Sequence, residues 1–151
     1  MKRTRSQGFT WVELAIAMLI VGILSSIALA KYDTHQKEIQ TNQAITDIRA
    51  ISMMISQYEL DNRSYPNSLT NIGQSQVLDP WGRPYAYLNH ATVHGNGPVR
   101  KNRNLNPINT DYDLYSLGPD GRTRTQLTAR DSQDDIVRAN NGAFVDIASK
   151  Y

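Results

Sequence analysis

The feature that most constrains this chain is a long apolar run close to its N-terminus. From Phe9 to Ala30 the sequence reads FTWVELAIAMLIVGILSSIALA, in which Glu13 is the single charged residue. As a helix this run is about 33 Å long, which is enough to cross the hydrocarbon core of a bilayer. The residues before it include three basic side chains and no acidic one, and basic flanks of this kind stay in the cytoplasm. We therefore expect a membrane-spanning helix over 9–30, with Lys31 and the residues after it outside the inner membrane.

Charge and cysteine content exclude several classes of protein. The formal net charge of the chain is +2, but the residues after the basic leader are close to neutral, which argues against a nucleic-acid-binding domain. The chain has no cysteine, so a disulfide framework and thiol catalysis are both excluded. The sequence shows no Ser/His/Asp set and no phosphate-binding loop, and we predict that the protein is not an enzyme.

A secretory signal peptide is the competing interpretation of the N-terminal run. Ala28-Leu29-Ala30 has the spelling of a signal-peptide cleavage site, but such peptides have an apolar stretch of only about 7–15 residues. Glu13 also favours a functional anchor, because a carboxylate inside a membrane helix costs about 2.5–3.5 kcal/mol and usually has a partner. A glutamate that reaches the headgroups from an ordinary anchor is the alternative.

The residues around the start of this run carry a resemblance to a known family. GFTWVE, from Gly8 to Glu13, resembles the class III prepilin signal of type IV pilins and pseudopilins. The resemblance implies that a membrane prepilin peptidase removes the leader 1–8 by cleaving between Gly8 and Phe9, and that Phe9 is then N-methylated. It also gives Glu13 a physical role in assembly, because its carboxylate can neutralise the free amine of Phe9 in a neighbouring subunit.

Beyond the membrane segment the pattern predicts that the helix continues over 31–61. Apolar residues recur there at spacings of three or four, at Ile45, Ile48, Ile51, Ile55 and Tyr58. We expect this face to pack against a sheet of the same chain, with a short coiled coil as the alternative, and we expect Met53 and Met54 to fill the core. The turn formers and the proline in DNRSYP predict the end of the helix near residue 61.

Residues 62–151 are predicted to form a small globular domain. Leu69 and Ile72 are the apolar anchors of an ordered connection over 62–76, with one short helical turn. Strands are expected after the Pro/Gly turn at 80–84, over 111–117 and over 142–147. The polar stretch 90–107 is expected to be an exposed loop that includes a solvated Arg100. The fold class is therefore α+β: a long N-terminal helix packed on a small antiparallel sheet, as in pilins.

Two segments of this domain resemble the major pseudopilins of the type II secretion system. DPWGRPYAYL, from Asp79 to Leu88, is similar to the segment that leads into their sheet, and SLGPDG, from Ser116 to Gly121, is similar to a loop that binds calcium in that family. The resemblance implies calcium as a cofactor. The implied ligands are the backbone carbonyl of Leu117 and the carboxylates of Asp120, Asp134 and Asp135. The alternative is that Asp120 is a turn former and that 132–135 cap a short helix through Ile136 and Val137.

These resemblances imply a major pseudopilin that polymerises into a periplasmic filament and drives protein export by the type II secretion system. The implied partners are further copies of the chain, minor pseudopilins, the prepilin peptidase and the inner-membrane assembly platform, and no nucleic acid is expected. The implied location is the bacterial inner membrane, with one pass, a cytoplasmic N-terminus and a periplasmic domain. The alternatives are a type IV pilus or competence pilin subunit and a monomeric membrane-anchored binding module.

Overall fold

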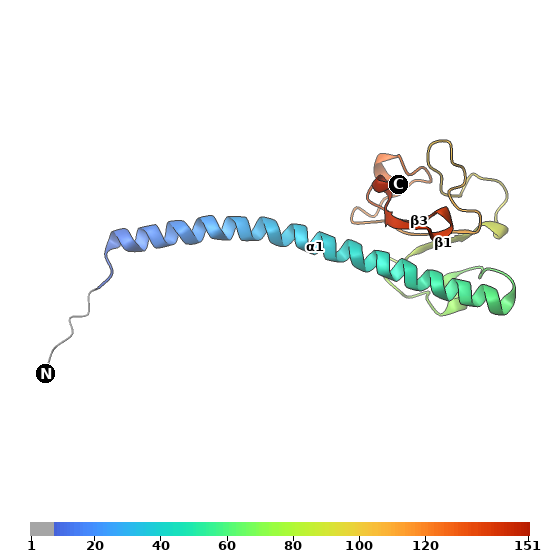
Figure 1. Cartoon of the computed structure of the whole chain (residues 1–151), viewed down its shortest axis with the longest axis horizontal. Coiled ribbons are helices and arrows are strands. Elements are labelled where there is room, and N and C mark those ends of the chain that lie inside the picture. Colours follow the sequence, from blue (N-terminus) through green and yellow to red (C-terminus); the bar gives the residue numbers. More distant parts are fainter. Residues whose placement is uncertain (1–7) are drawn as a thin grey trace. The chain divides into compact units, whose positions relative to one another are not determined.

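One long helix runs through both compact units of the chain. The computed structural model describes residues 8–151, so the leader residues 1–7 lie outside the described part. Helix α1, Trp11–Asn62, has 52 residues; one unit ends at Glu38 and the second runs from Ile39 to Tyr151 (Figure 1). The helix ends one residue beyond the predicted position, at the turn formers before Pro66.

The first part of α1 has a surface of exposed apolar side chains. It contains a stretch long and apolar enough to cross a membrane. The exposed apolar side chains include Trp11, Val12, Leu14, Ile16, Met18, Leu19, Ile20, Val21, Ile23 and Leu24. A surface of this kind is unfavourable in water and suits a lipid environment.

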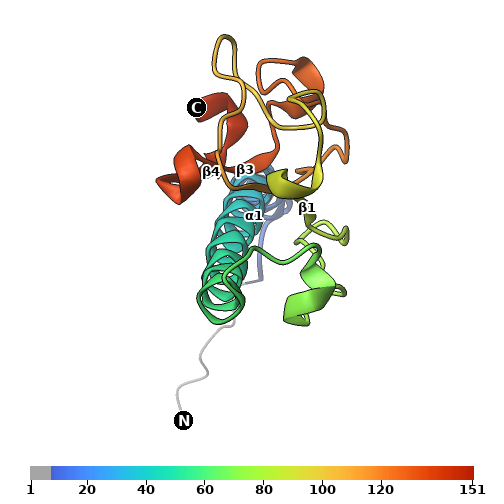
Figure 2. The same ribbon diagram turned by 90° about the vertical axis from the view of Figure 1, so that its right-hand side faces the viewer.

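The second unit contains a four-stranded antiparallel sheet. The strand order is β1-β2-β3-β4, so each strand pairs with the next strand along the chain. The strands are β1 Ala86–Asn89, β2 Tyr112–Ser116, β3 Ile136–Ala139 and β4 Phe144–Ile147. Short 3₁₀ turns, among them η1 Leu69–Ile72 and η3 Arg130–Ser132, lie in the connections. Figure 2 looks along α1 and shows the strands on one side of its C-terminal part.

The C-terminal part of α1 packs on one face of the sheet, which confirms the predicted α+β fold. Ile48, Ile51 and Ile55 are buried against Tyr112 and Leu114 of β2, and other buried residues extend this core. The helical spacing of the isoleucines places them on one face, and that face is the one against the sheet. The prediction that Met53 and Met54 fill the core was wrong, because they are 68% and 40% exposed.

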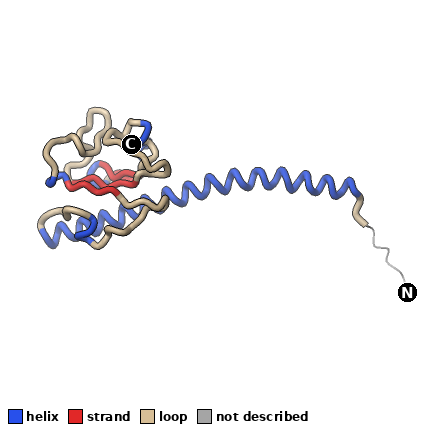
Figure 3. The backbone as a smooth tube through the Cα atoms, turned by 180° about the vertical axis from the view of Figure 1, so that it is seen from behind, coloured by secondary structure: helices blue, strands red, loops and turns tan. Residues whose placement is uncertain are grey.

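Loops cover the other face of the sheet. In Figure 3 the red strands of the second unit lie between α1 and a layer of tan loops. Under this layer a second apolar cluster is formed by Ile108, Leu127, Val137, Ala139 and Ala148. We call the loops that cover this face, residues 99–110 and 117–135, the loop layer. When both faces of a sheet are buried, the sequences of its strands are continuously apolar and do not alternate between apolar and polar residues.

One alternative and one prediction from the sequence fail in this region. Ile136 and Val137, which the alternative to the calcium site placed in a short helix, instead begin strand β3. The stretch 90–107 is not simply an exposed loop, because Val99 and Arg100 are each only 2% exposed. These two residues are buried because the loop folds back over the sheet.

Candidate functional site

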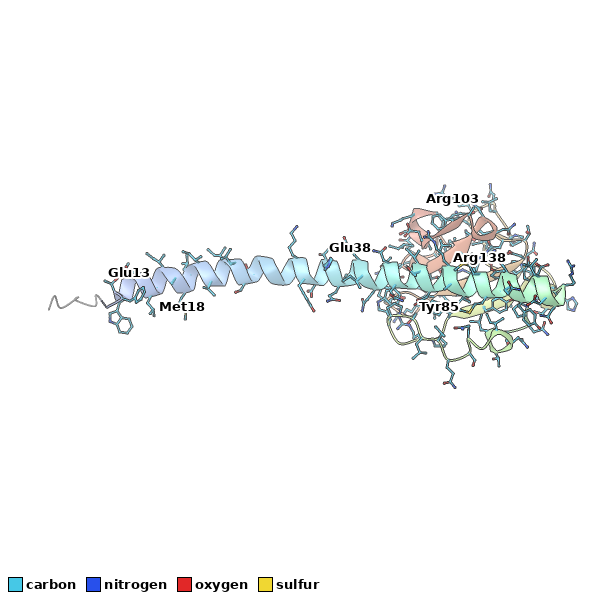
Figure 4. All side chains as sticks on the ribbon, turned by 60° about the horizontal axis from the view of Figure 1, so that its bottom comes forward. Glu13, Met18, Glu38, Tyr85, Arg103 and Arg138 are labelled. Carbon is cyan, nitrogen blue, oxygen red and sulfur yellow. The ribbon has the colours of Figure 1, made fainter. Side chains whose placement is uncertain are left out.

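The start of α1 is held by a capping box. The side-chain oxygen of Thr10 accepts a hydrogen bond from the Glu13 backbone N–H at 3.2 Å. In return, Glu13 Oε2 accepts one from the Thr10 backbone N–H and one from the Thr10 hydroxyl, both at 2.9 Å. This reciprocal arrangement satisfies donors that the first turn of any helix leaves unpaired. Glu13, labelled in Figure 4, therefore already has a partner in its own chain.

The capping box places the carboxylate close to the predicted processing point. Gly8 and Phe9 precede the helix, outside any helix or strand, and are exposed, with Phe9 88% exposed. The carboxylate of Glu13 lies at the positive end of the helix dipole, beside the backbone N–H groups of the first turn. Cleavage after Gly8 would leave the amine of Phe9 one residue before Thr10. Cleavage, methylation and intersubunit pairing themselves stay predictions.

The structure brings two of the predicted metal ligands together. The backbone N–H of Asp120 donates to Asp134 Oδ2 at 3.2 Å, so these two aspartates are neighbours. Asp120 Oδ1 accepts a further hydrogen bond from the Arg122 backbone N–H at 2.8 Å, as in a turn. Gly118 makes this contact possible, because its backbone has φ +62° and the backbone of Asp134 occupies the space that a Cβ would need.

Asp135, the third predicted carboxylate, contacts different groups in the interior. It is fully buried, and its Oδ2 lies 2.5 Å from a guanidinium nitrogen of Arg100 and accepts from the Thr123 hydroxyl at 2.6 Å. Burial raises the pKa of Asp135 to about 6, and Arg100 and Thr123 offset only part of that effect. The other oxygen, Oδ1, has no hydrogen-bond partner among the residues that the structure describes.

A second arginine contacts the loop that contains Leu117 and Asp120. Arg83 donates to the carbonyl oxygen of Gly118, and its guanidinium lies where a side chain on Gly121 would have to be. A cationic side chain therefore already contacts the backbone of the turn that was expected to hold a metal ion.

The predicted calcium ligands do not form one set. Calcium takes six to eight oxygen ligands, usually with several carboxylates. Within residues 8–151, no three His, Cys, Asp or Glu side chains are grouped closely enough to hold a metal ion. Asp120 and Asp134 are adjacent, Leu117 is half-buried in the same loop, and Asp135 is bound to Arg100. These residues do not fit the four-ligand site that the sequence predicted, and calcium binding itself stays a prediction.

Sequence reasoning missed three residues that determine these arrangements. The signal for Thr10 was present, because Thr10-x-x-Glu13 is the spelling of a capping box before an apolar run. Arg83 and Arg100 had no such local signal. Arg83 binds the backbone at Gly118, 35 positions away, and the separation between Arg100 and Asp135 is also 35 residues.

Comparison with known proteins agrees with the N-terminal geometry. A family model described as the prokaryotic N-terminal methylation motif matches residues 3–29. The type II secretion system core protein G of Pseudomonas aeruginosa is 29% identical to this chain over 143 residues, covering 81% of this chain and 89% of that protein. The resemblance to the pilin-like pseudopilins is thereby confirmed.

Other pseudopilins and one pilin are similar to a comparable degree. The type II secretion system core protein G of Klebsiella pneumoniae is 27% identical, with 87% of this chain and 93% of that protein covered. The type IV major pilin protein PilE of Neisseria gonorrhoeae is 28% identical, with 91% and 84% covered. No solved structure matches this chain significantly. The prepilin motif and the apolar start of α1 together fit a membrane-anchored pseudopilin.

Proposed function

We propose that this chain is the major pseudopilin of a type II secretion system and polymerises into the periplasmic filament that drives protein export. The observation that carries the proposal is the similarity to secretion core proteins G over more than four fifths of the chain. The exposed apolar first part of α1 supports it, because that surface suits first the membrane and then the packed core of a filament.

The role we propose is structural rather than enzymatic. The relatives described above are named as secretion-system core proteins and as a pilin. We propose that the chain crosses the inner membrane once, with a cytoplasmic N-terminus and a periplasmic domain. Its proposed partners are further copies of itself, minor pseudopilins, the prepilin peptidase and the inner-membrane assembly platform.

A type IV pilin is the second candidate. The gonococcal major pilin is 28% identical to this chain, which is close to the value for the core proteins G. The prepilin motif does not separate the two, because it is typical of both type IV pilins and pseudopilins. Their cellular functions differ, and a genetic experiment can distinguish them.

The test is a deletion strain of the source bacterium that is complemented with the natural chain or with a variant. Under the proposed function, the deletion strain retains exported proteins in the periplasm while its surface pili persist in electron micrographs, and the natural chain restores secretion. Loss of pili with normal secretion would instead identify a type IV pilin.

A pair of variants tests the role of Glu13 in the same strain. We expect Glu13→Ala to be cleaved normally but not to restore secretion, because the amine of Phe9 would have no carboxylate partner in the next subunit. Glu38→Ala is the matched control, since Glu38 is an exposed acidic residue of the same helix. Full secretion with Glu13→Ala would show that amine pairing is not needed for assembly.

A further inference from the structure

A single buried guanidinium connects the loop layer to the sheet. Arg100 comes from the loop 99–110, and its side chain is 3% exposed. Its guanidinium donates to Asp135 Oδ2 at 2.5 Å, to the hydroxyl of Thr123 and to the carbonyl oxygen of Arg124 at 2.8 Å. The same group lies over the ring of Tyr115 in β2, 4.2 Å from its centroid. One positive charge thus contacts three separate segments of the chain.

The backbone of Arg100 adds a further connection to the same strand. Its N–H donates to Asp113 Oδ2 at 2.7 Å, and Asp113 is itself 1% exposed. Asp113 Oδ1 accepts from the side-chain amide of Asn109 at 3.0 Å. The buried carboxylates on this side of the sheet therefore receive hydrogen bonds from the loop layer.

These contacts resemble in kind those of a bound metal ion. A structural cation in a loop region collects carboxylate, hydroxyl and carbonyl oxygens from separate segments, and Arg100 does so with Asp135, Thr123 and Arg124. A calcium ion on Asp135 Oδ2 would lie about 2.3–2.6 Å from that oxygen, beside a guanidinium nitrogen at 2.5 Å. The calcium ion and the guanidinium would then share one carboxylate oxygen, and two positive charges on the same oxygen repel each other strongly in a buried site.

We propose that Arg100 is an internal cation of this domain and that the loop layer folds around it without calcium. Arg83 supports the proposal at a second point of the loop layer, since its guanidinium binds the Gly118 carbonyl in the turn that the sequence assigned to calcium. A guanidinium suits this role because it stays protonated and presents several donors in one plane. The proposal concerns the stability of the domain and does not depend on which filament the chain forms.

The test is the thermal unfolding of the full-length chain in detergent micelles, followed by circular dichroism. The natural chain is expected to have the same melting temperature in excess calcium chloride and in excess EDTA. A calcium-dependent rise of several degrees would overturn the proposal. This measurement needs no variant, so it holds even if a substitution prevents folding.

A matched pair of arginine variants completes the test. Arg100→Gln is expected to lower the melting temperature by about 10 °C or more, because it leaves a buried carboxylate without its cation. Arg124→Gln is the control, since its side chain is 71% exposed and pairs with Asp131 at the surface; we expect a shift below about 3 °C. Equal melting temperatures for the two variants would overturn the proposal. If Arg100→Gln does not fold, Arg100→Lys replaces it in the test, since lysine keeps the charge but not the planar set of donors. The melting temperature of Arg100→Lys is expected to lie below that of the natural chain by more than the shift of Arg124→Gln.

Discussion

Single residues in the loop layer have roles that only long-range contacts reveal. Gly118 lies in a turn that the sequence predicted, and glycine is expected there from the local pattern alone. The backbone of Asp134 occupies the space that a Cβ on Gly118 would need, which no local pattern indicates. Likewise, Arg100 looks like one of several solvated basic residues until its loop folds back to Asp135. The candidate site was thus predictable in its segments but not in the partners of its charged groups.

Replacement of Gly118 by alanine is expected to destabilise the domain by more than about 2 kcal/mol. The residue has φ +62°, which is unfavourable for alanine, and the added Cβ would overlap the backbone of Asp134. Gly95→Ala is the control, since Gly95 has φ +77° with open space around it and should lose only about 1 kcal/mol. Urea unfolding of both variants measures the difference. Equal losses would show that the turn moves away from Asp134 at little cost.

At the level of elements, the sequence predicted best where one face is buried and the other is exposed. The C-terminal part of α1 has this property, and its isoleucine stripe identified both the helix and the face against the sheet. β2 and β4 were also expected, because their residues lie between clear turn signals. β3 was missed because all four of its residues are buried, including Arg138, so its pattern does not alternate. Arg138 is stabilised there by Asp111, at 2.6 Å, and by the ring of Tyr112.

The stripe on α1 gives a direct test of helix packing. Ile55→Ala is expected to lower the free energy of unfolding by about 2–5 kcal/mol, because Ile55 is fully buried and truncation leaves a cavity against the sheet. Met53→Ala, on the exposed side of the same turn, should change it by less than about 0.5 kcal/mol. Chemical unfolding of the two variants provides the comparison. Similar losses for both would mean that Met53 is also packed.

At the scale of the whole molecule, the two units of the chain suit different environments, lipid for the first and water for the second. The first unit exposes its apolar side chains, whereas the second buries apolar residues on both faces of its sheet. The length and hydropathy of the first run predicted this division directly. The second unit was harder to predict, because its connecting segments are held by contacts between distant residues, such as the hydrogen bond from Tyr87 to the Pro66 carbonyl at 2.8 Å.

The tyrosines of the second unit predict how the domain responds to alkaline pH. Burial raises the pKa of Tyr85 and Tyr87 well above the ordinary value, and burial also raises the pKa of Tyr112 and Tyr115. In the unfolded chain these groups ionise near pH 10. Their contribution to stability is therefore fully present below about pH 10 and is lost as the pH rises above that value, because only the unfolded chain releases the protons.

We therefore expect the melting temperature of the full-length chain in micelles to be nearly constant from about pH 8 to 9.5 and to fall steeply above about pH 10. Tyr87→Phe removes one of these groups together with its hydrogen bond to Pro66, so it should lower the melting temperature at pH 8 but make the alkaline fall shallower. Tyr32→Phe, at a side chain that is 61% exposed, should leave both the starting value and the slope unchanged. If the melting temperatures of Tyr87→Phe and of the natural chain fell in parallel with rising pH, Tyr87 would ionise alike in the folded and unfolded chain. The burial of Tyr87 would then not contribute to the pH dependence of stability.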